Sequence, residues 1–212
     1  TMVGNVARSY NLYQMANEYI RNHDKCNIVN LGVGLETPYY RIDRKNALFY
    51  EVDLPDVIEL RKKYIEVGEN EKYIKGDLFK LDWCDELDTS IPTLLIVSGV
   101  FQYFHEEDIL SFIKSIKETF ENVELIFDAT NKFGIKYCNF YVKRTGNKSA
   151  MMYFYIEDPK EFAEKANCQL IECRGFYKDV LKILGKKLGL YSNIAMRIAD
   201  KRKNAMILHL KL

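Results

Sequence analysis

Two glycines and an aspartate are the residues of this sequence whose types and spacing best suit a ligand-binding site. Gly32 and Gly34 directly follow an apolar segment at 27–31, and Asp53 comes 19 residues after Gly34. Glycine lets backbone N–H groups approach a ligand without interference from a Cβ atom. In nucleotide-binding α/β sheets, a carboxylate about 20 residues beyond such glycines binds the ribose hydroxyls. The spacing therefore predicts a nucleotide site at a strand–helix turn, with the helix beginning at residues 35–37.

The glycine pair and two nearby carboxylates each allow more than one interpretation. A pair of glycines after a strand is also typical of an ordinary tight turn, and it is Asp53 that favours the nucleotide site. Glu51 is a second carboxylate nearby, but strand alternation points it to the opposite face from Tyr50 and Val52. Asp77 follows a short strand and either binds an adenine amino group or caps a turn.

The hydrophobic pattern predicts alternating strands and helices in one domain. Strands are expected at residues 28–31, 47–52, 73–75, 92–99, 123–127, 169–176 and 205–212. Helices are expected at residues 6–22, 55–64, 106–120 and 159–166, and at 180–203 with interruptions at two glycines. This order predicts a doubly wound, mostly parallel α/β sheet. In the last strand alternate leucines face inward, so His209 is expected to face outward without a functional role.

Basic and aromatic residues gather in two late segments of a chain whose net charge is only +1. Residues 132–148 contain five Lys or Arg and no acid, and residues 178–203 contain eight Lys or Arg against two Asp. These segments are either solvated helix faces or a lid, at 131–150 and 178–203, that attracts an acidic substrate. The neutral chain lacks the basic excess of nucleic-acid-binding proteins, so nucleic acid is not the expected partner.

The cysteines and the hydropathy profile indicate a cytoplasmic protein. Five cysteines without a Cys-x-x-Cys pair argue against a disulfide framework and against a zinc site. No apolar run of 18 residues and no signal peptide are present, so no membrane partner is expected.

Four segments taken together resemble the leucine carboxyl methyltransferase family, which includes tetracenomycin-type polyketide O-methyltransferases. The segments are NLGVGLET at 30–37, FYEVDLP at 49–55, GDL at 76–78 and SGVFQYF at 98–104. The resemblance extends from Arg8 to the final strand. It implies a Rossmann-like methyltransferase fold, a seven-stranded sheet with an antiparallel C-terminal strand and a helical lid. The implied cofactor is S-adenosylmethionine, with S-adenosylhomocysteine as its product.

The same resemblance implies a role for individual residues. Arg8 corresponds to the arginine that binds the methionine carboxylate of the cofactor, while Gly32 and Gly34 line its methionine portion. Asp53 corresponds to the ligand of the ribose hydroxyls. Asp77 and Leu78 lie at the adenine.

At Ser98 the sequence departs from the family pattern. Ser98 and Gly99 stand where the family commonly has Glu followed by a small residue or Cys. Ser98 retains a hydrogen-bonding group but brings no charge to the cofactor ammonium.

The implied reaction is transfer of a methyl group to a carboxylate or hydroxyl of a small acidic or phenolic molecule, or to a protein C-terminus. A carboxylate acceptor is already ionised and needs no base, whereas a hydroxyl needs one, for which His105 and Tyr103 are the candidates.

Two other functions share parts of this pattern. A methyltransferase-like module that binds without turnover is favoured only by Ser98. A nicotinamide-dependent oxidoreductase would share the glycines and Asp53, but Thr37 occupies the third glycine position of G-x-G-x-x-G. The acceptor and the oligomeric state are not indicated by the sequence.

Overall fold

The computed structural model describes residues 2–146, 150–184 and 187–212. Among these residues, seven strands form one sheet in the order β3-β2-β1-β4-β5-β7-β6. The strands are β1 (Cys26–Leu31), β2 (Ala47–Asp53), β3 (Glu71–Lys75), β4 (Thr93–Val97), β5 (Val123–Thr130), β6 (Gln169–Gly175) and β7 (Ala205–Lys211). Only β7 runs against its neighbours, β5 and β6, within the described sheet. The predicted mostly parallel α/β sheet with an antiparallel last strand is confirmed.

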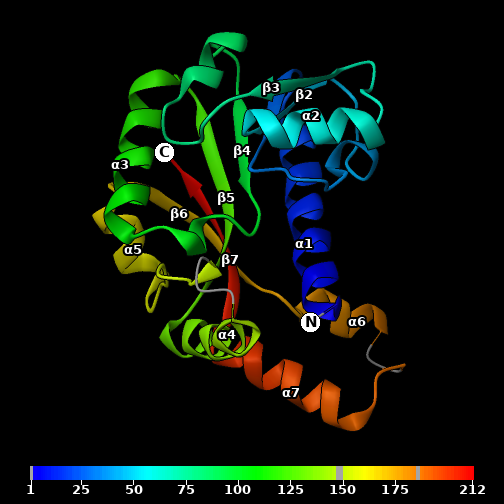
Figure 1. Cartoon of the computed structure of the whole chain (residues 1–212), viewed down its shortest axis with the longest axis vertical. Coiled ribbons are helices and arrows are strands. Elements are labelled where there is room, and N and C mark those ends of the chain that lie inside the picture. The colour runs from blue at the N-terminus through cyan, green and yellow to red at the C-terminus, as the bar shows by residue number, and fades with distance from the viewer. Residues whose placement is uncertain (1, 147–149, 185–186) are drawn as a thin grey trace.

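Helices cover both faces of this sheet (Figure 1). They are α1 (Met2–Arg21), α2 (Pro55–Tyr64), α3 (Glu106–Thr119), α4 (Lys132–Thr145), α5 (Pro159–Lys165), α6 (Lys178–Leu184) and α7 (Leu190–Lys201). In Figure 1, α1 lies on one side of the sheet, while α3 and α5 lie on the other. The central strand β4 is buried along its whole length, as its continuous apolar sequence predicts. Alternate residues of β4 join two separate cores, with Leu95 and Val97 on the α3 side and Leu94 and Ile96 on the α1 side.

The helix expected to begin at residues 35–37 is absent, so that prediction is wrong. The chain instead turns after β1 and forms a short 3₁₀ helix at Pro38–Tyr40. Proline has no backbone N–H and disfavours helical geometry in the residue before it. Thr37 accordingly adopts φ −122° and ψ 56°. The connection from β1 to β2 is therefore a loop, whose carbonyl groups need partners from other elements.

His209 does not face solvent as expected, because β7 is an interior strand with both faces covered. Ile207 on the same face is fully buried, like Leu208 on the other. The His209 side chain is 13% exposed and its Nε2 atom lies 2.6 Å from Oε2 of Glu124 on β5. The residue thus forms a cross-strand pair.

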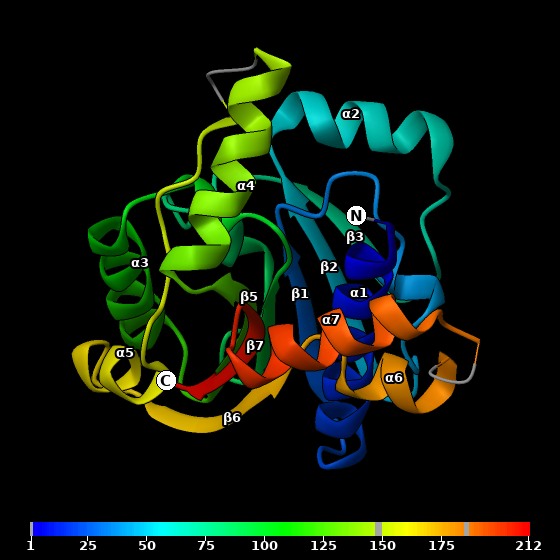
Figure 2. The same ribbon diagram turned by 90° about the horizontal axis from the view of Figure 1, so that it is seen from below.

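Three helices lie at the edge of the sheet where β1, β2, β4, β5 and β6 end. α4 follows β5, α6 follows β6, and α7 precedes the antiparallel β7. Figure 1 shows all three below the sheet, and Figure 2 views them from that side. They contain most of the two predicted lid segments. Residues 147–149 and 185–186 of those segments lie outside the described residues.

Candidate functional site

The predicted glycines and aspartate come together where β1 and β2 end. Gly32 and Gly34 have φ values of +68° and +56°, in the left-handed region that favours glycine. A Cβ atom at Gly32 would lie only 2.5 Å from Cγ2 of Val100, so the close packing of Val100 also favours glycine at this position. The Asp53 carboxylate accepts hydrogen bonds from Gly34 N (2.7 Å) and Leu54 N (2.8 Å). Asp53 is therefore held by backbone donors on both sides.

Beside Asp53 lies a cavity of about 400 Å³ with mostly apolar walls. Its lining residues are Leu31, Gly32, Val52, Asp53, Leu54, Gly76, Asp77, Leu78, Phe79, Val100 and Phe104. Asp77 accepts a hydrogen bond from Phe79 N (2.9 Å) through Oδ1, which fixes the turn after β3. The rings of Phe79 and Phe104 pack edge to face with centroids 4.6 Å apart. A concave apolar cavity with a few fixed polar groups is typical of a small-molecule site.

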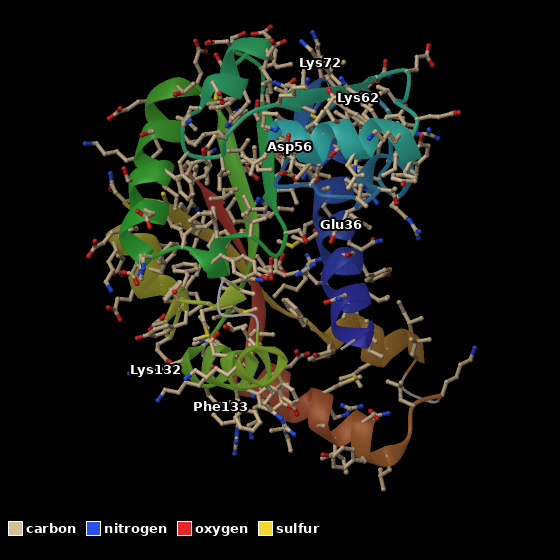
Figure 3. All side chains as sticks on the ribbon, viewed as in Figure 1. Glu36, Asp56, Lys62, Lys72, Lys132 and Phe133 are labelled. Carbon is tan, nitrogen blue, oxygen red and sulfur yellow. The ribbon has the colours of Figure 1, made fainter. Side chains whose placement is uncertain are left out.

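Arg8 on α1 lies between two carboxylates. Its Nη2 atom is 3.2 Å from Glu36 Oε1, and its Nη1 atom is 3.6 Å from Asp128 Oδ2. Figure 3 shows Glu36 beside α1. Asp128 also accepts a hydrogen bond from Gly99 N (2.5 Å), and a Cβ atom at Gly99 would lie 2.6 Å from Arg8 Nη1. Burial raises the pKa of Asp128, and the nearby Arg8 opposes that rise.

Two polar atoms of this cluster have no hydrogen-bond partner among the residues that the structure describes. They are Arg8 Nε and Ser98 Oγ, both buried. Buried polar atoms are normally paired, so these two atoms lack the partner that burial calls for. Arg8, Ser98 and Gly99 thus lie together, on the α1 side of the Gly32 turn.

Arg61 on α2 holds the loop after β1 and was missed in the sequence. Its Nη1 atom donates to the carbonyl oxygens of Gly34 (3.1 Å) and Glu36 (2.5 Å), supplying partners that a helix would have provided. Its guanidinium group is fully buried, lies 3.6 Å from Glu71 Oε1 and packs over the Tyr73 ring. In the sequence Arg61 precedes two lysines and resembles an ordinary surface cation, so no spacing indicated this role.

Glu51 completes the buried network under the loop and does not line the cavity. Its side chain is fully buried and accepts a hydrogen bond from Asn30 Nδ2 (3.2 Å). Burial raises the pKa of Glu51 well above its ordinary value, with Arg61 opposing. Since Arg61 also faces Glu71, one cation lies near two carboxyl groups, and burial raises the pKa of both.

His105 and Tyr103 do not line the Asp53 cavity. His105 precedes α3, stacks on Tyr153 with ring centroids 4.6 Å apart, and lines a separate hollow of about 300 Å³. Tyr103 is 40% exposed, in a short 3₁₀ helix (Phe101–Tyr103). Phe104, which stands between them in the chain, does line the Asp53 cavity.

Metal-binding clusters and membrane-spanning helices are both missing from the described residues. No group of three or more His, Cys, Asp or Glu residues in this part of the chain is arranged to hold a metal ion. None of the helices described is both long and apolar enough to cross a membrane.

Comparison with known families matches residues 3–117 to the model of the leucine carboxyl methyltransferase family. This match covers more than half of the chain. The chain belongs to the leucine carboxyl methyltransferase family. The resemblance seen in the sequence is thereby confirmed, and the matched region carries Arg8, the Gly32 turn, Asp53, Asp77 and Ser98.

Two curated relatives of this family member share low identity with it. The tetracenomycin polyketide synthesis O-methyltransferase of Streptomyces glaucescens is 23% identical, over 63% of this chain and 50% of that protein. Leucine carboxyl methyltransferase 1 of the rat is also 23% identical, over 58% of this chain and 48% of that protein. The matching region thus spans about half the length of each relative.

Solved structures share the fold of this family member. Magnesium protoporphyrin IX methyltransferase from Synechocystis, solved with bound SAH, matches with a TM-score of 0.58, at 12% identity over 97% of this chain and 84% of that one. A DUF574-family protein from Streptomyces avermitilis matches with a TM-score of 0.67, at 14% identity over 99% of this chain and 82% of that one. At such identities the likeness establishes the fold alone.

Proposed function

We propose that this member of the leucine carboxyl methyltransferase family is an S-adenosylmethionine-dependent methyltransferase. The observation that carries the proposal is the Asp53 carboxylate, fixed by Gly34 N and Leu54 N on the wall of the 400 Å³ cavity. Each of its oxygens accepts one backbone hydrogen bond, so each retains a lone pair for a ribose hydroxyl. Family membership and the SAH bound to a protein of the same fold support this choice of nucleoside.

The residues around Asp53 fit the other parts of the cofactor. Asp77 and Leu78 line the far side of the cavity and would hold the adenine. Arg8, Ser98 and Gly99 would hold the amino-acid portion, using the unpartnered Arg8 Nε and Ser98 Oγ atoms. When bound, S-adenosylmethionine supplies a methyl group activated by its sulfonium. The protein's own task is to align the acceptor with that methyl group and to exclude water.

The acceptor that the geometry supports best is a carboxylate, on a small acidic molecule or a peptide C-terminus. An ionised carboxylate needs no base, and neither His105 nor Tyr103 lines the cavity. A phenolic or alcoholic acceptor would require one of these two residues to move toward it.

We propose that α4, α6 and α7 form the lid that receives this acceptor. Phe133 and Tyr137 on α4 are 62% and 57% exposed, and Leu190 and Tyr191 on α7 are 79% and 86% exposed. Figure 3 shows Phe133 next to Lys132 on α4. Such apolar side chains beside cations suit an acidic molecule with an apolar body.

Calorimetric titration with S-adenosylhomocysteine tests the proposal. We expect one site in the wild-type protein and about 100-fold weaker binding in Asp53→Ala, because two charge-assisted hydrogen bonds to the ribose are lost. Asp56→Ala is the matched control, since Asp56 is an exposed carboxylate three residues away that does not line the cavity. It should leave the affinity unchanged.

Three results would point elsewhere. Equal affinity in Asp53→Ala and wild type would contradict the site. Binding of NADH in place of S-adenosylhomocysteine would favour the oxidoreductase. Cofactor binding without methyl transfer across a broad panel of carboxylate and phenolic acceptors would favour a binding module.

A further inference from the structure

Strand register places Gly32, Ser98 and Asp128 in one row at the edge of the sheet. In the parallel pairs of β1, β4 and β5, Leu31 pairs with Val97 and Val97 pairs with Phe127. Gly32, Ser98 and Asp128 each come one residue after these paired residues. Register partners in a sheet point to the same face, so the side chains of Ser98 and Asp128 lie side by side on the face that α1 covers.

Asp128 is the carboxylate in this row, and its charge is only partly compensated. Its side chain is 10% exposed, so water provides little solvation. Gly99 N donates one hydrogen bond, but Arg8 Nη1 stands 3.6 Å away, beyond hydrogen-bond distance. Arg8 also faces Glu36, so one cation lies between two carboxylates. A buried carboxylate is costly unless paired, and Asp128 has no cation within hydrogen-bond distance among the described residues.

The amino-acid portion of S-adenosylmethionine carries one ammonium and one carboxylate group, which match this cluster. We infer that Asp128 binds the ammonium group of the cofactor, beside the carboxylate group that the family resemblance assigns to Arg8. Ser98 Oγ, buried in the same row without a partner among the described residues, provides a neutral acceptor beside them. The charge that Ser98 does not bring is thus supplied by the neighbouring strand. This inference rests on the proposed function.

Binding of two nucleosides distinguishes a contact between Asp128 and the ammonium group from a general loss of the pocket. S-adenosylhomocysteine contains the amino-acid portion, whereas 5′-methylthioadenosine has the same adenosine and sulfur without it. We expect Asp128→Asn to weaken binding of S-adenosylhomocysteine about 10- to 100-fold, the value of a lost hydrogen bond between charged groups. Binding of 5′-methylthioadenosine should change less than about twofold, because its contacts at Asp53 remain.

Two more variants complete the experiment. Asp56→Asn removes an exposed carboxylate outside the cavity and should leave both affinities unchanged. Gly99→Ala places a Cβ atom 2.6 Å from Arg8 Nη1 and should reproduce the selective loss if Asp128→Asn does not fold. Normal binding of 5′-methylthioadenosine shows in each variant that the pocket is folded.

The outcomes are distinct. Unchanged affinity of Asp128→Asn for S-adenosylhomocysteine overturns the inference while leaving the proposed function in place. An equal loss for both nucleosides also overturns it, since Asp128 would then only support the fold. If the wild-type protein binds neither nucleoside, the proposed function itself is wrong and the inference falls with it.

Discussion

The cofactor side and the lid side of the candidate site are built in opposite ways. On the cofactor side, Asp53 and the Gly32 turn are fixed by hydrogen bonds, and Arg61 beneath them is fully buried. On the lid side, no described residue of α7 is buried, and Leu190 and Tyr191 are largely exposed. The first surface is held by contacts within the protein, whereas the proposed lid leaves large apolar side chains exposed. Residue types therefore indicate the cofactor much more closely than the acceptor.

The largest expected effect is on the cofactor side, from Arg61→Met. The substitution leaves the carbonyl groups of Gly34 and Glu36 without their donor and leaves Glu71 without its cation. Breaking a buried ion pair in this way costs about 3–5 kcal/mol, measurable as a loss of unfolding free energy in urea.

Lys62→Met is the matched control for this prediction. Lys62 is the next residue of α2, and its side chain is 47% exposed. A change below about 0.5 kcal/mol is expected for such a surface position. If Arg61→Met cost no more than Lys62→Met, the loop would not depend on Arg61, and the contrast between the two sides would fail.

The next effect is on the lid side and concerns the acceptor only. Tyr137→Ala and Tyr191→Ala should each raise the KM for the acceptor about tenfold, equivalent to about 1.4 kcal/mol of contact energy. The affinity for S-adenosylhomocysteine should not change. Tyr64 on α2 is 75% exposed, between the values for Tyr137 and Tyr191, and Tyr64→Ala should alter neither quantity. A loss of cofactor affinity in the lid variants would show that the two sides are not separate.

The smallest effect is a change in pH dependence from Glu51→Gln. The folded protein keeps a proton on Glu51 that the unfolded chain releases above its ordinary pKa of 4.5, so wild-type stability falls as pH rises from there toward the raised pKa. Glutamine has no proton to release. In urea unfolding, the free energy of unfolding of the variant minus that of the wild type should therefore be larger at pH 8 than at pH 5.

Glu59→Gln provides a control of opposite sign. Lys75 lowers the pKa of Glu59, so the stability that this exposed carboxylate contributes is complete above its ordinary pKa of 4.5 and is lost as pH falls below it. Glu59→Gln should therefore leave the difference between pH 5 and pH 8 unchanged and should alter the profile only below pH 4.5. Identical pH profiles for wild type and Glu51→Gln would mean that Glu51 is ionised in the folded protein.

The sequence predicted those parts of the molecule that depend on local patterns. The alternation of strands and helices follows from apolar runs, and Asp53 beside the Gly32 turn follows from one spacing. The expected helix at residues 35–37 failed because Pro38 excludes it. Arg61 and Asp128 could not be assigned roles, since their partners come from distant loops and strands that only the folded chain brings together.

Hydrogen exchange of the wild-type protein with and without S-adenosylhomocysteine tests the central claim most directly. We predict slower exchange at residues 32–34, 53–54, 77–79 and 98–100, where the cofactor would cover the backbone. Exchange in α7 should stay unchanged until an acceptor is added. Protection confined to α6 and α7, or no protection at the Gly32 turn, would contradict the assignment of the cofactor to the Asp53 cavity.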